Sequence, residues 1–336
     1  MNLEKIAELA GVSRATVSRV INNHPYVKED VRQRVLEVIE REGFQPNAAA
    51  RMLARQRTEV LGVISPEGLS PVFSTSYFQI LFEGISASIN QTDYVMSMWT
   101  SSTPAETERI FKRILSYKLM DGALLLSAVE NDTLTRRLVE RKVPTVMIGR
   151  CALPEVLTVD VDNVAAARTA TEHLIRLGRR RIGHIFGRRD LLSAGERFQG
   201  YQLALEASGI AYDPELVIEG DYTDISGYLA ARKLIPRGID ALFSASDTMA
   251  VGALQALNEQ GLSVPRDVAI IGFDDLPIAS TSRPALSTMR QPIQELGSFA
   301  VRTLVDLIAG KITPPYRVIL PTELILRETC GALGDS

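Results

Sequence analysis

Residues 1–22 read MNLEKIAELAGVSRATVSRVIN, and two short helical patterns meet in this stretch at Gly11. In the first pattern, apolar residues such as Leu3 and Ile6 recur at helical spacing, and Asn2 stands where a helix N-cap belongs. In the second, apolar and polar residues fall mostly on opposite sides. A helix, a tight glycine turn and a second helix form the helix-turn-helix pattern, in which the second helix enters the major groove of DNA.

The polar side of the second pattern has the chemistry of a DNA reader. Short polar side chains can sit close to phosphates, and an arginine is long enough to reach a base edge. Both kinds occur here, at Arg14, Thr16, Ser18, Arg19 and Asn22. An ordinary helical hairpin with a solvated polar face has the same spacing, so spacing alone leaves both interpretations open.

The same stretch resembles the N-terminal signature of the LacI/GalR family of repressors. The resemblance rests on the run Leu3-x-x-Ile6-Ala7-x-x-Ala10-Gly11-Val12-Ser13-x-x-Thr16-Val17-Ser18-Arg19-Val20-Ile21-Asn22, and later motifs extend it over almost the whole chain. Lys5 departs from the family pattern, which usually has an acidic residue there. Arg14 and Ala15 occupy the positions that choose half-site bases in the family. The DNA contacts that the resemblance implies in this segment are Leu3, Ser13, Arg14, Ala15, Thr16, Ser18, Arg19 and Asn22.

An alanine-rich segment, residues 48–55, follows a third predicted helix at residues 29–42. A linker helix is the simple interpretation. The resemblance implies a hinge helix that orders on the operator, pairs with its partner across the minor groove and wedges Leu53 between base pairs. Because a short isolated helix is marginal in water, small changes elsewhere in the protein would order or melt it. The DNA contacts implied for this segment are Asn47, Ala50, Leu53 and Ala54.

From about residue 59 the chain alternates between apolar strands and amphipathic helices. This alternation predicts parallel sheets that are covered by helices on both faces. A second, similar round begins near Val159, so two α/β halves in tandem are expected. The predicted fold is an all-α helix-turn-helix headpiece followed by a bilobed α/β domain of two parallel sheets, which resembles the periplasmic binding proteins. The predicted domains are residues 1–45 (headpiece), 46–58 (hinge helix and linker), 59–159 with 291–318 (first lobe) and 160–290 with 319–330 (second lobe).

Polar side chains that follow buried strands are candidates for a ligand site between the lobes. Arg197 lies in the run Gly195-Glu196-Arg197-Phe198-Gln199-Gly200-Tyr201, which matches the family's arginine motif, and an Arg and Asp pair can hold vicinal hydroxyls. Simpler roles stay open: Arg197 as a surface residue, Asp247 as a helix cap and Tyr222 as a core edge. The effector contacts that the resemblance implies are Tyr77, Arg150, Ser193, Arg197, Tyr222, Asp247, Asp274 and Gln291.

Composition and absent motifs argue against several classes of protein. Cys151 and Cys330 lie far apart without metal-ligand spacing, which indicates a reducing cytoplasm and no disulfide framework. The sequence has no secretion-signal pattern and no run of about eighteen apolar residues, so a cytoplasmic location without a membrane span is predicted. No phosphate-binding loop, nucleophile elbow or metal motif occurs, so no cofactor, metal or enzymatic activity is expected.

Charge and motifs together predict a ligand-responsive repressor. Residues 1–58 carry ten Lys or Arg against seven Asp or Glu in a chain whose net charge is −3, as expected for a basic headpiece on an acidic body. The predicted partners are a pseudo-palindromic operator, a second copy of the chain, and a sugar or related small molecule as effector. One alternative is a solute-binding receptor with no DNA role. Another is an enzyme that uses Asp247 and Asp274 as a glycosidase pair.

Overall fold

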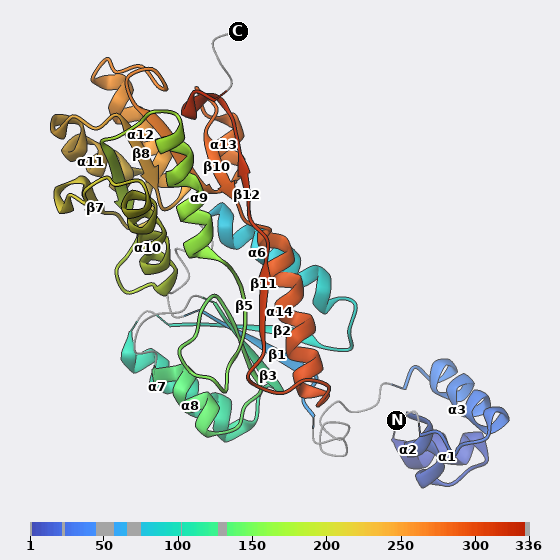
Figure 1. The fold of residues 1–336 in the computed structure, drawn as a ribbon. Coiled ribbons are helices and arrows are strands. Elements are labelled where there is room, and N and C mark those ends of the chain that lie inside the picture. The colour runs from blue at the N-terminus through green and yellow to red at the C-terminus, as the bar shows by residue number, and fades with distance from the viewer. Residues whose placement is uncertain are drawn as a thin grey trace. The chain divides into compact units, whose positions relative to one another are not determined.

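The computed structural model forms two compact units, Met1–Glu59 and Val60–Ser336 (Figure 1). Several predictions lie outside the residues that it describes: the whole of the expected hinge helix, and the expected DNA contacts Asn22, Asn47, Ala50, Leu53 and Ala54. The described residues are 2–21, 24–44, 57–65, 75–101, 103–126 and 133–332.

In the first unit, the described residues form α1 (Leu3–Ala10), α2 (Arg14–Ile21) and α3 (Glu29–Arg41). The Asn2 side chain caps α1 by accepting a hydrogen bond from the backbone N–H of Lys5. Gly11 ends α1 with φ of 65°, a left-handed conformation that glycine adopts without steric cost. One buried side chain from each helix meets in a small core, formed around Ile6, Val17 and Val35.

In the second unit, the described residues form two six-stranded sheets, one in each lobe. The first lobe is built on a sheet of order β11-β5-β4-β3-β1-β2, and all its paired strands are parallel. One face packs on α6 and α14, and the other on α7 and α8. The elements are β1 (Val60–Ser65), α6 (Ser76–Ile89), β2 (Val95–Thr100), α7 (Pro104–Tyr117), β3 (Gly122–Leu126), α8 (Thr133–Glu140), β4 (Thr145–Ile148), β5 (Leu157–Val161), α14 (Ile293–Ile308) and β11 (Arg317–Leu320).

The second lobe is built on a sheet of order β12-β10-β9-β8-β6-β7. Its strands are parallel except β12, which pairs antiparallel with β10. Helices α9 and α10 cover one face, and α11 and α12 cover the other (Figure 1). The elements are α9 (Asn163–Arg176), β6 (Ile182–Phe186), α10 (Leu192–Ala207), β7 (Val217–Glu219), α11 (Asp224–Leu234), β8 (Ala241–Ser244), α12 (Asp247–Glu259), β9 (Ala269–Asp274), α13 (Pro277–Thr281), β10 (Ser287–Arg290) and β12 (Glu323–Ile325), with short 3₁₀ turns at Pro214–Leu216, Ile235–Arg237 and Glu328–Cys330.

The described chain passes between the lobes at three places: from β5 to α9, from β10 to α14, and from β11 to β12. The bilobed fold of two largely parallel sheets is therefore as predicted. Strand β5 stays in the first lobe's sheet as far as Val161, two residues beyond the expected lobe boundary. The sequence also missed α13 and β10.

Two glycines bring α6 and α14 into backbone contact in the first lobe. A Cβ atom added to Gly84 on α6 would lie 1.8 Å from the backbone oxygen of Gln294, and one added to Gly297 on α14 would lie 2.4 Å from the backbone oxygen of Leu81. Both distances are impossible for real atoms, so the close crossing of α6 (cyan) and α14 (orange-red) in Figure 1 requires glycine at both positions.

Candidate functional site

A cavity of about 330 Å³ lies between the two lobes, at the carboxyl ends of several strands. This volume is within the range of small-molecule sites. The first lobe contributes the start of α6 and the ends of β4 and β5, and the second lobe contributes the start of α10 and the ends of β7, β8 and β9. Seven of the eight predicted effector contacts line the cavity: Tyr77, Arg150, Ser193, Arg197, Tyr222, Asp274 and Gln291.

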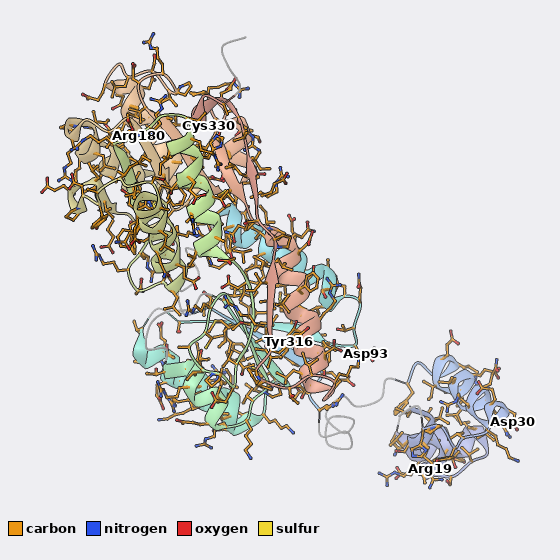
Figure 2. The ribbon with its side chains drawn as sticks, viewed as in Figure 1. Arg19, Asp30, Asp93, Arg180, Tyr316 and Cys330 are labelled. Atoms are coloured by element: carbon orange, nitrogen blue, oxygen red, sulfur yellow. The ribbon has the colours of Figure 1, made fainter. Side chains whose placement is uncertain are left out.

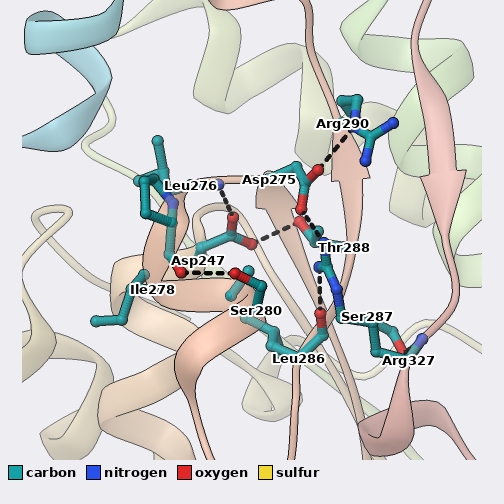
Figure 3. Close-up of polar contacts among 12 residues, drawn as sticks. Asp247, Asp275, Leu276, Ile278, Ser280, Leu286, Ser287, Thr288, Arg290 and Arg327 are labelled. Carbon is teal, nitrogen blue, oxygen red and sulfur yellow. Dashed lines mark hydrogen bonds and ion pairs between the residues drawn. The ribbon is translucent and has the colours of Figure 1, made fainter.

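Asp247, the eighth predicted contact, is not part of the cavity lining. Its side chain is fully buried, and its carboxylate accepts hydrogen bonds from the backbone N–H of Leu276 and from the Thr288 hydroxyl (Figure 3). Burial, reinforced by the nearby charge of Asp274, raises the pKa of Asp247 well above its usual value. The geometry therefore gives Asp247 a structural role, in which it ties the start of α12 to β10 and to the loop after β9.

Arg197 is buried in the second lobe and held from several sides. Its Nε donates to Asn163 Oδ1 at 3.0 Å, and its Nη1 donates to the backbone oxygen of Ala245 at 2.6 Å and to Asp274 Oδ1 at 3.4 Å. The guanidinium carbon lies 3.7 Å from the ring centre of Phe273, which adds a cation–π contact. Among the described residues Nη2 has no hydrogen-bond partner, so the group is fixed in place with one donor edge available for a ligand.

Asp274, the last residue of β9, faces Arg197 in a strained backbone conformation. Its φ is 115°, and that of Asp275 is 60°. The Asp275 carboxylate is clamped by Arg290 and Arg327, each at 2.7 Å, which holds this unusual backbone in place (Figure 3). Burial raises the pKa of Asp274 to about 6, although the charge of Arg197 and a hydrogen bond from Gln291 lower it.

Tyr222 adds an aromatic surface to the cavity after β7. It too has a positive φ, of 70°. Its ring packs directly against the backbone of Gly187. The closeness is shown by a Cβ atom added to Gly187, which would lie 2.2 Å from the Tyr222 hydroxyl oxygen. The position of the ring therefore depends on the absence of a side chain at residue 187.

A chain of hydrogen bonds joins the two lobes beside the cavity. Arg150, which follows β4, donates to Glu196 Oε1 on α10 at 2.7 Å. Glu196 Oε2 accepts from Asn163 at 3.2 Å, and Asn163 in turn accepts from Arg197. Glu196 lies in the arginine motif at residues 195–201, but the sequence predicts no role for it. The sequence also does not identify Asn163 as a site residue. Both are buried polar residues whose partners come from other elements, so only the folded chain reveals them.

In the headpiece, α2 buries Val17 and Val20 and presents its other side to solvent. Arg19, labelled in Figure 2, is exposed. The Ser13 hydroxyl accepts a hydrogen bond from the backbone N–H of Thr16 and so caps the start of α2. Of the described residues that were predicted to contact DNA, Ser13, Arg14, Ala15 and Arg19 are exposed, and Leu3, Thr16 and Ser18 are half-buried.

The described residues hold neither a membrane-spanning helix nor a metal-binding cluster. No helix in that part of the chain combines the length and apolar character that a membrane crossing requires. No group of three or more His, Cys, Asp or Glu side chains there is arranged to hold a metal ion.

Both parts of the chain match known families. Residues 2–47 match the model of the bacterial regulatory proteins of the lacI family, and residues 171–330 match that of a periplasmic binding protein-like domain. The chain is 39% identical over 332 residues to the HTH-type transcriptional regulator CelR of Thermobifida fusca, covering 97% of each protein. It is 33% identical over 334 residues to the HTH-type transcriptional regulator RegA of Clostridium saccharobutylicum, covering 98% of each.

Solved structures agree with these matches. The complex of the transcriptional regulator CelR with cellobiose superposes with a TM-score of 0.78 at 37% identity, covering 98% of this chain and 99% of the other. The lac repressor dimer bound to operator and the anti-inducer ONPF superposes with a TM-score of 0.84 at 26% identity, with the same coverage. The relatives are transcriptional regulators and not enzymes, and the match at residues 2–47 excludes a receptor without a DNA-binding region. The chain therefore belongs to the LacI family of transcriptional regulators, with a helix-turn-helix headpiece and a periplasmic-binding-protein-like effector domain.

Proposed function

We propose that this protein is a cytoplasmic, sugar-responsive repressor that binds a pseudo-palindromic operator as a homodimer. The observation that carries the proposal is the buried Arg197 and Asp274 pair, which faces a cavity between the lobes of a LacI-family chain. A guanidinium and a carboxylate side by side can hold neighbouring hydroxyl groups through charge-assisted hydrogen bonds. Tyr77 and Tyr222 supply aromatic surface for the apolar side of a sugar ring.

The comparison with CelR supports a disaccharide as the effector. That regulator, 37% identical to this chain, forms a complex with cellobiose. We therefore infer that a cellobiose-like glucoside occupies the cavity. Its proposed contacts are Tyr77, Arg150, Ser193, Arg197, Tyr222, Asp274 and Gln291.

Operator recognition is assigned to α2 and to the hinge segment at residues 46–58. In the dimer, two copies of α2 would enter successive major grooves, and the hinge segments would meet in the minor groove with Leu53 as the wedge. Each lobe has exposed apolar residues that a second copy would cover: Val95 (61% exposed) and Met96 (42%) on β2, and Ile225 (68%) and Leu229 (54%) on α11.

The effector and the operator are coupled through the domain between them. Binding of the sugar closes the cleft and changes how the first lobes of the two protomers meet, which alters the order of the hinge segment and hence the affinity for DNA. Such coupling is typically worth about 1–3 kcal/mol and is reciprocal, so the operator must change the affinity for the sugar by the same factor.

A gel shift with a duplex chosen from a randomised-site selection tests this function. We expect the full-length protein to bind a pseudo-palindromic duplex, with affinity that falls steeply as salt rises because phosphate contacts release counterions. Cellobiose should change this affinity by about 5- to 150-fold. A protein that selects no duplex at low salt, with or without cellobiose, would contradict the proposal.

Gly187→Ala is expected to weaken cellobiose binding by about two- to tenfold, the usual worth of an aromatic contact. The added methyl group would occupy space that now belongs to the Tyr222 ring and push the ring into the cavity. Isothermal titration calorimetry with cellobiose measures the effect. Gly195→Ala is the matched control, because a Cβ atom there meets nothing within 4 Å. Equal affinities for the two variants would show that the position of the ring is unimportant.

A further inference from the structure

The positive charge that lines the cavity is already matched by carboxylates of the protein. Each of the three arginines in the lining forms an ion pair with an acidic side chain. These pairs are Arg150–Glu196 at 2.7 Å, Arg188–Asp190 at 2.5 Å and Arg197–Asp274 at 3.4 Å. An anionic ligand would therefore have to compete with these carboxylates for every arginine it met.

Asp160 is the opposite case, a carboxylate in the lining that lacks a full set of partners. It lies near the end of β5 in the first lobe and is 5% exposed. Its Oδ1 accepts hydrogen bonds from the backbone N–H of Val161 at 2.8 Å and from Asn163 Nδ2 at 3.4 Å. Its Oδ2 is buried and has no hydrogen-bond partner among the described residues. Arg317 Nη2 lies 3.9 Å from Oδ2, which is too far for a hydrogen bond.

The charged groups around Asp160 do not compensate for the missing hydrogen bond at Oδ2. Glu196 on α10 repels its charge, while Arg317 on β11 and Arg197 on α10 attract it. Burial is the largest effect, and it raises the pKa of Asp160 to about 6. At pH 7.5 the side chain is therefore mostly ionised, with one oxygen left unpaired. A buried, unsatisfied polar atom costs stability, so such atoms are rare in proteins and each one calls for an explanation.

We propose that Asp160 binds the effector: a turn of its carboxylate about the Cβ–Cγ bond presents the oxygen that now lacks a partner to a ligand hydroxyl on the first-lobe side of the cavity. This inference rests on the proposed sugar effector and narrows its class. Asp160 lies across the cavity from Asp274 in the second lobe, so one hydroxyl-rich molecule can bind a carboxylate of each lobe.

Asp160 also determines which charge an effector in this cavity can carry. Asp221 also lies in the lining and is exposed. Partial burial raises its pKa, but hydrogen bonds from Thr223 and Ser226 outweigh burial and lower the pKa overall, so Asp221 stays charged as well. With the arginines already paired, Asp160 and Asp221 leave the cavity negative. The effector class is therefore a neutral polyhydroxylated molecule, and phosphorylated sugars are disfavoured.

Calorimetric titration of the full-length protein with cellobiose and with cellobiose 6′-phosphate tests the proposal. We expect the wild type to prefer cellobiose. Asp160→Asn should lower the affinity for cellobiose about tenfold, because a charge-assisted hydrogen bond becomes a neutral one, and should raise the affinity for the phosphate. The control is Asp162→Asn, the same chemical change at an exposed residue that caps α9, where asparagine caps equally well.

Two titration results would overturn the proposal. One is an Asp160→Asn variant that binds cellobiose as tightly as the wild type. The other is a wild-type protein that binds the phosphate at least as tightly as cellobiose. A residue with a merely structural role would not change the two affinities in opposite directions.

Thermal melting without ligand tests the role of Asp160 independently of either sugar. If neither sugar binds the wild type, cellobiose is excluded as the effector, but the melting experiment still decides the role of Asp160. The folded-state pKa of about 6 lies above the ordinary value of about 3.9, so the ionised carboxylate destabilises the fold above pH 6, and this penalty fades as the pH falls toward 4. Asp160→Asn should therefore melt at a higher temperature than the wild type at pH 7.5, with a smaller difference at pH 4.5. A variant that melts lower at pH 7.5 would make Asp160 a structural residue and overturn the proposal.

Discussion

Arg197→Ala is expected to reduce cellobiose binding at least about a hundredfold while operator binding persists. Hydrogen bonds to charged groups are worth about 1.5–3 kcal/mol each, and the guanidinium would lose every contact it makes to the ligand. The change also leaves Asp274 buried without its cation. Without that cation the pKa of Asp274 would rise further, which favours the neutral carboxyl and weakens its charge-assisted bonds as well.

Calorimetry with cellobiose measures the loss, and a gel shift shows whether the operator complex still responds to the sugar. Arg197→Lys is a second informative variant, because lysine keeps the charge but not the planar fork of donors, so it should not restore binding. Arg189→Ala is the matched control, since Arg189 is exposed and its surface ion pair with Glu219 contributes little. If Arg197→Ala bound cellobiose within a few-fold of the wild-type affinity, the Arg197–Asp274 pair would not be part of the effector site.

Arg19→Ala is expected to weaken operator binding by about 1–3 kcal/mol, or roughly 5- to 150-fold, while cellobiose binding stays unchanged. Arg19 is exposed on the solvent side of α2, whose opposite side is packed in the headpiece core. Its removal should therefore leave the fold intact and delete one contact to DNA. The measurement is a gel shift with the selected duplex beside one with a scrambled sequence.

Arg34→Ala is the control for Arg19, since it removes one positive charge from the same unit at an exposed position on α3. An equal loss in both variants would mean that headpiece charge alone, and not a specific contact from α2, sets the affinity. A simultaneous loss of cellobiose binding in Arg19→Ala would contradict the separation of DNA-reading and effector-sensing roles.

The parts of the fold that were predicted from sequence are those with a clear local signal. The strand at Gly122–Leu126 is a continuous apolar run, the pattern from which a buried parallel strand is predicted, and the structure forms a buried strand there. The strand at Ser287–Arg290 was missed because its buried residues include Ser287 and Thr288, which look like loop residues in the sequence. Hydrogen bonds from distant elements, such as the one between Thr288 and Asp247, allow these polar groups to be buried.

The same limit applies to the site. Asp247 and Asp274 are indistinguishable in the sequence, because each lies where a buried strand ends, yet only Asp274 lines the cavity. The backbone at Asp274 has a φ of 115°, a feature that no local pattern predicts. Asp160 was overlooked for a related reason: its importance comes from an unpaired oxygen, and that depends on which partners the rest of the chain fails to supply.

The glycine-mediated crossing of α6 and α14 has a mechanical consequence. Tyr77 stands in the first turn of α6, and α14 begins just after Gln291, so both helices start beside the cavity. Helices that touch through their backbones have no compressible side-chain layer between them and cannot slide independently. The two helices should therefore move as one rigid body, about 21–24 Å long for helices of 14 and 16 residues. A small tilt that the sugar imposes at their N-terminal ends would reach their C-terminal ends in full.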